Sequence, residues 1–172
     1  MSHHARLGDV AAGAAAAGAP PVDDATGRFL HVLARALGAR RILEIGTGIG
    51  ASTLYLATAL PGEGMLITLE KDRPRAERAR QRADDAGVGA LVTVMIGEAG
   101  RYLHKIAGPF DLVFEDAGPE VGAALHDRLV ALVRPGGVLV THGAGSHASD
   151  DGRLVAAHLP LGGGLTLSVK RP

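Results

Sequence analysis

Several features that often reveal a protein's chemistry are missing from this chain of 172 residues. It contains no cysteine, which excludes disulfide bonds, cysteine nucleophiles and metal sites built from thiolates. Its formal net charge is zero, so nothing indicates the basic surface of a nucleic-acid-binding protein. No segment approaches the roughly 18 consecutive apolar residues of a membrane span, and no basic region leads into a leucine-rich core as in a secretory signal. We therefore expect a cytoplasmic protein that binds neither nucleic acid nor membrane.

The length corresponds to one domain with a substantial core. Residues 1–21 are rich in alanine and glycine and end in two prolines, a composition that predicts a flexible or partly helical arm. Residues 22–172 are expected to form the single domain, and no internal repeat is evident within them.

Apolar runs alternate with helical patterns along this domain. The expected strands are 42–45, 65–69, 91–96, 111–115 and 138–142, and the expected helices are 24–37, 51–60, 73–85, 98–106 and 119–133. The charged body of the 73–85 helix is expected to be a solvated outer face. Residues 153–171 carry two extended runs split by three glycines, which predicts a hairpin. This order predicts an α/β fold with a doubly wound, Rossmann-like, mostly parallel sheet, in which ligands bind at the carboxyl ends of the strands.

A glycine-rich turn, Gly46-x-Gly48-x-Gly50, follows the first strand, and Glu70 ends the second. A glycine turn lets backbone and ligand approach closely, and an acid at the next strand end can accept hydrogen bonds from a ribose diol. The spacing differs from the G-x-G-x-x-G that suits a pyrophosphate. Glu44, two residues before the turn, is awkward beside a diphosphate but acceptable near a cationic ligand. A nicotinamide oxidoreductase is therefore the disfavoured alternative.

The pattern E-x-G-x-G-x-G with a strand-end acid resembles motif I of the class I methyltransferases, which bind S-adenosylmethionine. From about residue 22 onward the chain resembles the bacterial O-methyltransferases related to catechol and caffeoyl-CoA O-methyltransferases. The matching stretches are 41–48, 51–54, 97–99, 110–117, 134–137 and 159–162. The resemblance implies a strand order 3-2-1-4-5-7-6 with strand 7 antiparallel. It also implies O-methylation of a small molecule, with S-adenosylhomocysteine as the other product.

The resemblance further implies a set of cofactor-binding residues. These are Glu44, Gly46, Thr47, Gly48, Ser52, Glu70, Lys71, Gly97, Glu98, Ala99 and Asp116. Glu70 would accept hydrogen bonds from the ribose hydroxyls, Ser52 would bind the methionyl carboxylate, and Asp116 would lie near the amino group. Residues 44–48 would line the methionine moiety, and residues 97–99 would border the adenine.

The resemblance breaks at the residues that hold a metal ion in most relatives. There a divalent cation, held by oxygen ligands, orients two vicinal hydroxyls and lowers the pKa of the one to be methylated. Relatives supply the ligands from Asp-Ala-Asp-Lys after strand four and Asp-Asn after strand five. In this chain residues 116–119 read Asp-Ala-Gly-Pro and residues 141–142 read Thr-His. Because only Asp116 remains, and Pro119 replaces a lysine that is a candidate base, we predict no metal site and a metal-independent enzyme.

His142 and Asp116 are the candidate catalytic residues. His142 ends strand five at the cofactor rim, and the pKa of a histidine suits proton transfer near neutral pH. A histidine with only a hydrogen-bonding role explains the same position equally well. His147 is a weaker candidate base; with Asp116 and His142 it could hold a softer metal such as zinc, which the spacing does not require.

Two helical segments of the relatives have no counterpart of ordinary length here. One precedes residue 22 and caps the substrate site, and the other lies between strand five and the hairpin. Residues 143–152 are too short and too rich in glycine for such a helix. We therefore expect an acceptor pocket that is open or completed by another subunit, as in a homodimer. The alternative is a non-catalytic module that retains the cofactor pocket as a subunit or regulatory partner.

Overall fold

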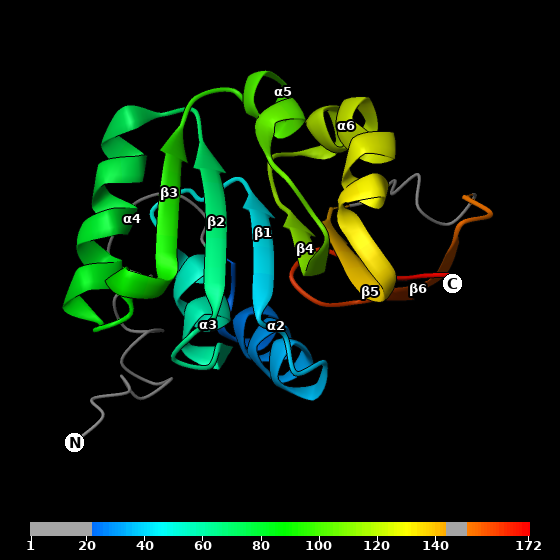
Figure 1. Cartoon of the computed structure of the whole chain (residues 1–172), viewed down its shortest axis with the longest axis horizontal. Helices are drawn as coiled ribbons and strands as arrows, with labels where there is room; N and C mark the ends of the chain where they lie inside the picture. The colour runs from blue at the N-terminus through cyan, green and yellow to red at the C-terminus, as the bar shows by residue number, and fades with distance from the viewer. Residues whose placement is uncertain (1–21, 144–150) are drawn as a thin grey trace.

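A computed structural model of the chain describes residues 22–143 and 151–172, and Figure 1 shows the arrangement of its elements. One sheet runs in the order β3-β2-β1-β4-β5-β7-β6. Its strands are β1 (Arg41–Ile45), β2 (Met65–Glu70), β3 (Val92–Ile96), β4 (Phe110–Glu115), β5 (Val133–His142), β6 (Leu154–Leu159) and β7 (Leu165–Lys170). Strands β1 to β5 pair in parallel, whereas β7 is antiparallel to both of its neighbours. The expected fold class, strand order and antiparallel strand are confirmed.

Helices cover both faces of this sheet. They are α2 (Asp24–Ala36), α3 (Ala51–Ala59), α4 (Arg73–Asp85), α5 (Ala99–Tyr102) and α6 (Pro119–Leu132), with the short 3₁₀ turns η1 (Gly89–Leu91) and η2 (Leu103–Lys105). One hydrophobic cluster joins α2, α3 and α4 to the sheet, and a second joins α5, η2 and α6 to it. None of the described helices is long and apolar enough to cross a membrane. The expected N-terminal arm and His147 lie outside the described residues.

Strand β5 begins earlier than the sequence predicts, at Val133 instead of residue 138. Phe110 pairs with Val133, the register then shifts, and Leu112 pairs with Val138. Residues 135–137, whose proline and glycines were expected to form a turn before this strand, are therefore an irregularity within it, because pairing with β4 occurs on both sides of them. The expected helix 98–106 is likewise divided into α5 and η2.

The N-terminus of α2 is fixed against α3 by Tyr55. The tyrosine ring occupies the space in which a Cβ atom on Gly27 would lie, so the two helices approach closely. The Tyr55 hydroxyl donates to Asp24 Oδ1 at 2.6 Å, and Asp23 caps the helix by accepting from the Thr26 N–H at 2.7 Å. These contacts hold the start of α2 at the carboxyl end of the sheet.

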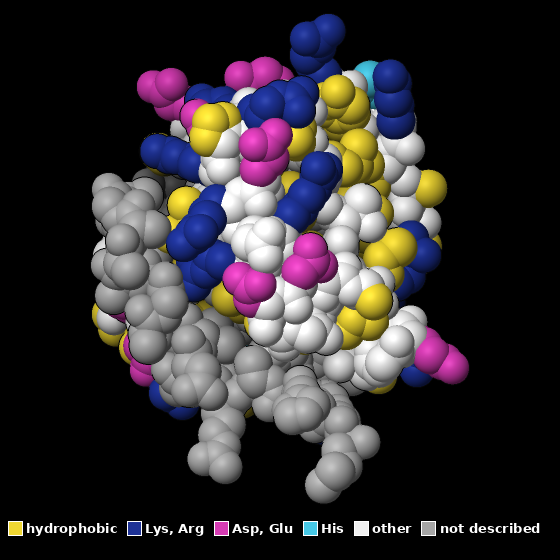
Figure 2. All heavy atoms as spheres, turned by 90° about the vertical axis from the view of Figure 1, so that its left-hand side faces the viewer, with side chains coloured by type: hydrophobic (Ala, Val, Ile, Leu, Met, Phe, Trp, Pro, Cys, Tyr) yellow, Lys and Arg dark blue, Asp and Glu magenta, His cyan; other side chains and the backbone are white. Residues whose placement is uncertain are grey.

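Helix α4 forms the edge of the molecule beside β3. Its buried side chains are all alanines, namely Ala76, Ala79 and Ala83, while most of its charged side chains are exposed. Figure 2 shows this side of the molecule with basic and acidic side chains interspersed. The prediction of a solvated outer face is confirmed for most of this helix; Arg82 is half-buried, and the exposed Arg75 also lines the cavity described below.

Candidate active site

A cavity of about 620 Å³ opens at the carboxyl ends of β1, β2, β4 and β5. Strand β1 lies between β2 and β4, so the cavity lies where the strand order reverses, the usual ligand position in such sheets. Ten of the eleven predicted cofactor residues line it: Gly46, Thr47, Gly48, Ser52, Glu70, Lys71, Gly97, Glu98, Ala99 and Asp116. The structure therefore brings these side chains to one place, although they come from five segments of the chain.

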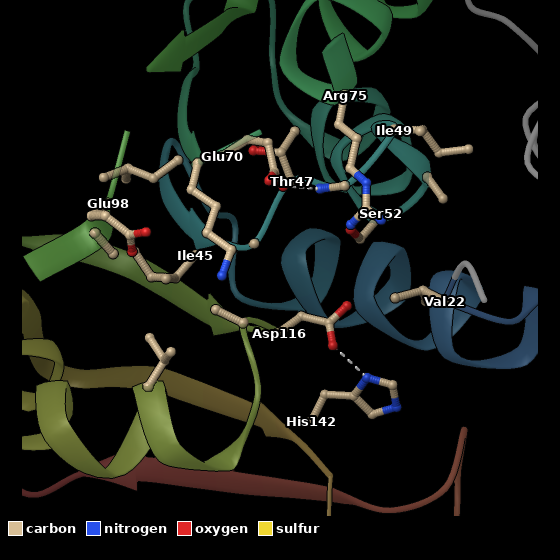
Figure 3. A pocket seen from close by; sticks show the side chains of 18 of the residues that line it. Val22, Ile45, Thr47, Ile49, Ser52, Glu70, Arg75, Glu98, Asp116 and His142 are labelled. Atoms are coloured by element: carbon tan, nitrogen blue, oxygen red, sulfur yellow. Dashed lines mark hydrogen bonds and ion pairs between the residues drawn. The ribbon is translucent and has the colours of Figure 1, made fainter. Parts of the chain in front are cut away.

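The lining residues follow one another in an order that suits an elongated ligand. In Figure 3, Glu98, Glu70, Thr47 and Ser52 succeed one another across the cavity, and Asp116 and His142 lie below them. A ligand lying along this row would contact the ends of β3, β2 and β1 in turn.

Two glycines in the turn after β1 have different surroundings. Gly46 has a φ of 92°, and a Cβ atom there would lie 2.6 Å from the Asp116 carbonyl oxygen. Gly48 has a φ of 52°, but apart from its chain neighbours no atom of the described residues lies within 4 Å of its hypothetical Cβ. Gly46 thus permits contact between the ends of β1 and β4, whereas Gly48 leaves free space in the cavity.

Glu70 is held in place from two directions. Its Oε2 accepts from the Gly48 N–H at 2.7 Å, and its Oε1 accepts from the Asp72 N–H at 2.9 Å. The side chain is 7% exposed and lines the cavity. A carboxylate can accept several hydrogen bonds, so these contacts leave acceptor capacity for ligand hydroxyls. The role of Glu70 at the ribose stays a prediction.

Glu44 is the one predicted cofactor residue that does not line the cavity. It is 0% exposed, and its Oε2 accepts from the hydroxyls of Thr53 at 2.6 Å and Thr68 at 2.7 Å. Its Oε1 has no partner among the described residues. Burial raises the pKa of this carboxyl group to about 7. Glu44 thus joins β1 to α3 and β2, and its expected contact with the methionine moiety stays a prediction.

Asp116, His142 and Gly162 form a second cluster on the opposite wall. His142 Nδ1 lies 2.6 Å from Asp116 Oδ1, and Nε2 lies 2.5 Å from the Gly162 carbonyl oxygen. A carbonyl and an ionised carboxylate can only accept, so both ring nitrogens must donate. The hydrogen bond that His142 donates to Asp116 is the largest cause that raises the pKa of His142 to about 9, against the opposing effect of burial. In this arrangement the imidazole has no free lone pair, which argues against the predicted role of His142 as a general base.

Several cavity-lining residues were missed from the sequence. Val22 and Asp23 precede α2, Val121 lies on α6, and Gly162 belongs to the β6–β7 turn. Arg75 also lines the cavity, although it lies in the charged helix that was interpreted as an outer face. Only its helical spacing from Ala79, which is buried, could have indicated that it turns inward.

The described donor set does not fit a hard divalent cation. In residues 22–143 and 151–172 no group of three or more histidine, aspartate or glutamate side chains could hold a metal. Asp116 is engaged by His142, and the carboxylate and amide ligands that follow strand five in a magnesium site are replaced by Thr141 and His142. The described side chains therefore do not supply the oxygen ligands that a magnesium-dependent centre needs.

Comparisons with known proteins agree with this geometry. The sequence profile described as O-methyltransferase matches residues 14–144. A catechol O-methyltransferase of Mycobacterium tuberculosis is 44% identical over 141 residues, covering 78% of this chain. The chain spans 64% of the length of that relative.

Two solved structures resemble the whole described fold. The O-methyltransferase TomG from Streptomyces achromogenes, involved in tomaymycin synthesis and solved with S-adenosylmethionine, superposes with a TM-score of 0.85 at 30% identity. It matches over 96% of this chain and 89% of its own. An O-methyltransferase from Bacillus cereus, solved with S-adenosylhomocysteine, gives 0.84 at 29% identity, covering 96% of this chain and 90% of its own.

Proposed function

The chain belongs to the O-methyltransferase family, and from this we propose that it transfers the methyl group of S-adenosylmethionine to a small-molecule hydroxyl without a metal ion. The observation that carries the proposal is the cavity that gathers the glycine turn, Ser52, Glu70 and Asp116. The complexes of TomG and the Bacillus cereus enzyme with this cofactor and its product support the same ligand here.

The cofactor is oriented by the order of residues along the cavity. We assign its adenine to residues 97–99, its ribose to Glu70 and its methionine moiety to the glycine turn and Ser52. Its amino group then lies on the side of Asp116, the acid that the other wall contributes. This orientation leaves the space near His142, Val22 and Val121 for the acceptor.

Methyl transfer is an in-line displacement in which an acceptor oxygen lone pair forms the new bond to carbon. The carbon–sulfur bond breaks, its electron pair stays on sulfur, and S-adenosylhomocysteine is released. Holding the two reactants in line supplies much of the acceleration. The acceptor must also lose its hydroxyl proton, which passes to solvent water, and a hydroxyl whose pKa is lowered by a nearby positive charge needs no strong base.

His142 then acts as a fixed positive charge instead of a base. Its imidazolium is held by Asp116 and Gly162 at the acceptor side of the cavity, and because both of its N–H groups are engaged it acts on the developing or preformed oxyanion through its charge alone. It takes over one task that the divalent cation performs in the relatives. A phenol is the acceptor class that fits this arrangement best.

The direct test is product formation from S-adenosylmethionine and a panel of phenols and catechols in EDTA, repeated with excess magnesium. Methylated product at equal rates in both conditions is the expected result. Turnover that requires magnesium would overturn metal independence. Tight binding of S-adenosylhomocysteine with no turnover of any acceptor would assign the chain to the non-catalytic alternative.

We also propose three further properties. The first is that the acceptor is a small molecule and not nucleic acid. The second is that the protein acts in the cytoplasm, and the third is that a homodimer completes the acceptor side of the cavity. The zero formal charge and the mixed charges on the face in Figure 2 support the first point. Sedimentation analysis tests the third, since a monomer at micromolar concentration would contradict it.

A further inference from the structure

Helix α4 packs directly on the glycine turn. A Cβ atom on Gly50 would lie 3.1 Å from the Cα atom of Ala79, so the helix backbone passes close to the turn. One turn further along the helix, the Arg82 guanidinium donates to the Ile49 carbonyl oxygen at 3.1 Å. Ala79 and Arg82 therefore mark the side of α4 that faces the cofactor-binding turn.

Arg75 lies on this same side, because residues four apart in a helix share a face. It lines the cavity, and Figure 3 shows its side chain extending toward Ser52. Its own backbone N–H donates to Asp72, so the cap of the helix fixes the position from which the side chain starts. The side chain is exposed at the rim, where a ligand could enter beneath it.

The charges in the cavity leave one group of the cofactor without a counter-ion. The amino group and the ribose have acidic partners in Asp116 and Glu70, but the methionyl carboxylate requires a cation. His142 already donates both ring N–H groups to protein acceptors. Lys71 follows Glu70 at the end of β2, on the ribose side.

Ser52 cannot supply this charge alone. Its side chain is 3% exposed and lines the cavity, but a hydroxyl donates only one hydrogen. A guanidinium with several donors in a fixed plane suits a carboxylate far better.

We propose that Arg75 binds the methionyl carboxylate of the cofactor together with Ser52. Arg75 is thus a cofactor-binding residue supplied by α4, a helix whose charge pattern otherwise indicates only solvation. This inference rests on the identity of the cofactor proposed above.

The test compares two ligands in calorimetric titrations at low salt: S-adenosylhomocysteine, which carries the carboxylate, and 5′-methylthioadenosine, which lacks the amino-acid group. Arg75→Gln should weaken binding of the first roughly tenfold, as expected for a charge-assisted hydrogen bond, and leave binding of the second unchanged. Arg75→Lys should give an intermediate loss. Arg78→Gln, an exposed arginine of the same helix that does not line the cavity, is the matched control and should bind both ligands normally.

Equal losses for both ligands would mean that Arg75 supports the cavity without contacting the carboxylate, and an unchanged affinity for S-adenosylhomocysteine would also overturn the proposal. Failure of the wild-type chain to bind S-adenosylhomocysteine would instead refute the proposed function. A selective loss in Lys71→Gln, with none in Arg75→Gln, would transfer the role to Lys71.

Discussion

At the scale of single residues, the charge of His142 determines how the acceptor is activated. Replacement by glutamine keeps a hydrogen-bonding side chain but removes the positive charge. We expect His142→Gln to lower kcat roughly tenfold, because a charge that acts without a direct hydrogen bond contributes about 1–2 kcal/mol in a partly hydrated cavity, with the Kd for S-adenosylhomocysteine nearly unchanged. His158→Gln, an exposed histidine outside the cavity, should behave as the wild type.

The pH dependence follows from the same residue. Its pKa is raised to about 9, so the imidazolium is present below that pH and is lost as the pH rises through it. Wild-type activity should therefore fall above about pH 9, whereas the residual activity of His142→Gln should lack this decline. Activity that instead rises as His142 deprotonates would restore the interpretation of this residue as a base.

The burial of Glu44 should make the protein less stable as the pH rises. Its pKa is about 7 in the folded chain against 4.5 when exposed, so the folded state binds the proton more tightly. Its contribution is most favourable below pH 4.5 and is lost as the pH rises to 7, amounting to about 3 kcal/mol in the free energy of unfolding. Glu44→Gln should remove this part of the dependence in urea denaturation between pH 5 and 8.

The control for this measurement is Glu63→Gln, because Glu63 is exposed and pairs only with exposed Arg40. Buried Glu115, whose pKa is also raised to about 7, should leave a similar slope in every variant. If Glu44→Gln kept the full wild-type slope, Glu44 would be ionised in the folded protein.

The cavity residues that could be predicted from the sequence are those whose position is set by the local backbone. Gly46, Gly48 and Glu70 could be predicted because a turn and the next strand end place them near the same ligand. The charge state of His142 could not, since it depends on the Gly162 carbonyl, which only the folded hairpin brings near. Arg75 was missed for a similar reason: its direction is set by how α4 packs on Gly50.

At the scale of elements, the contact between α2 and α3 sets the position of the acceptor side. The Tyr55 ring fills the place of a Cβ atom on Gly27, so Gly27→Ala should displace the ring or separate the helices. We expect a loss of about 1–2 kcal/mol in the free energy of unfolding, since overpacking of about 1–3 kcal/mol exceeds the better helix propensity of alanine. The KM of the acceptor should rise because Val22 and Asp23 move with α2.

Gly100 provides the matched control, because it is also helical but has only Leu125 at 3.9 Å from its hypothetical Cβ. Gly100→Ala should be neutral or slightly stabilising in the same denaturation assay. A stabilised Gly27→Ala variant would show that the ring can move aside without cost.

Element boundaries followed the hydrophobic pattern wherever pairing was regular. The first, second and fourth strands were predicted to within about one residue, since their apolar runs end in glycine, proline or charge. Strand β5 was shortened in the prediction because Pro135 and the following glycines resemble a turn. The partner strand overrides that local signal, since β4 pairs with residues on both sides of it.

At the scale of the whole molecule, ligand binding should stabilise the fold without a metal. At a concentration of S-adenosylhomocysteine 100 times its Kd, linkage adds about 2.7 kcal/mol, which for a domain of this size raises Tm by roughly 5–10 °C. We expect the same shift in EDTA and in magnesium by differential scanning calorimetry. A shift that appears only with magnesium would contradict a cofactor site built from the protein alone.

The alternation of strands and helices was sufficient to predict the α/β class and the rim at which ligands bind. The complete strand order required the family resemblance, because local patterns do not say which strands become neighbours. Metal independence stays a prediction, and the sequence could not show that Asp116 and His142 would contact each other, because the fold brings them together from two different strands.

The close approach of Gly46 to the Asp116 backbone has a consequence for the order of folding. The turn follows β1, the first strand in the chain, but its contact with the Asp116 backbone forms only when β4 pairs with β1. The opposite wall of the cavity, where His142 contacts Gly162, forms only when the final hairpin pairs with β5. Such distant pairings are the slow part of assembling a parallel sheet. During refolding, recovery of cofactor binding will therefore lag behind recovery of helical circular dichroism, so ligand capture reports the last stage of assembly.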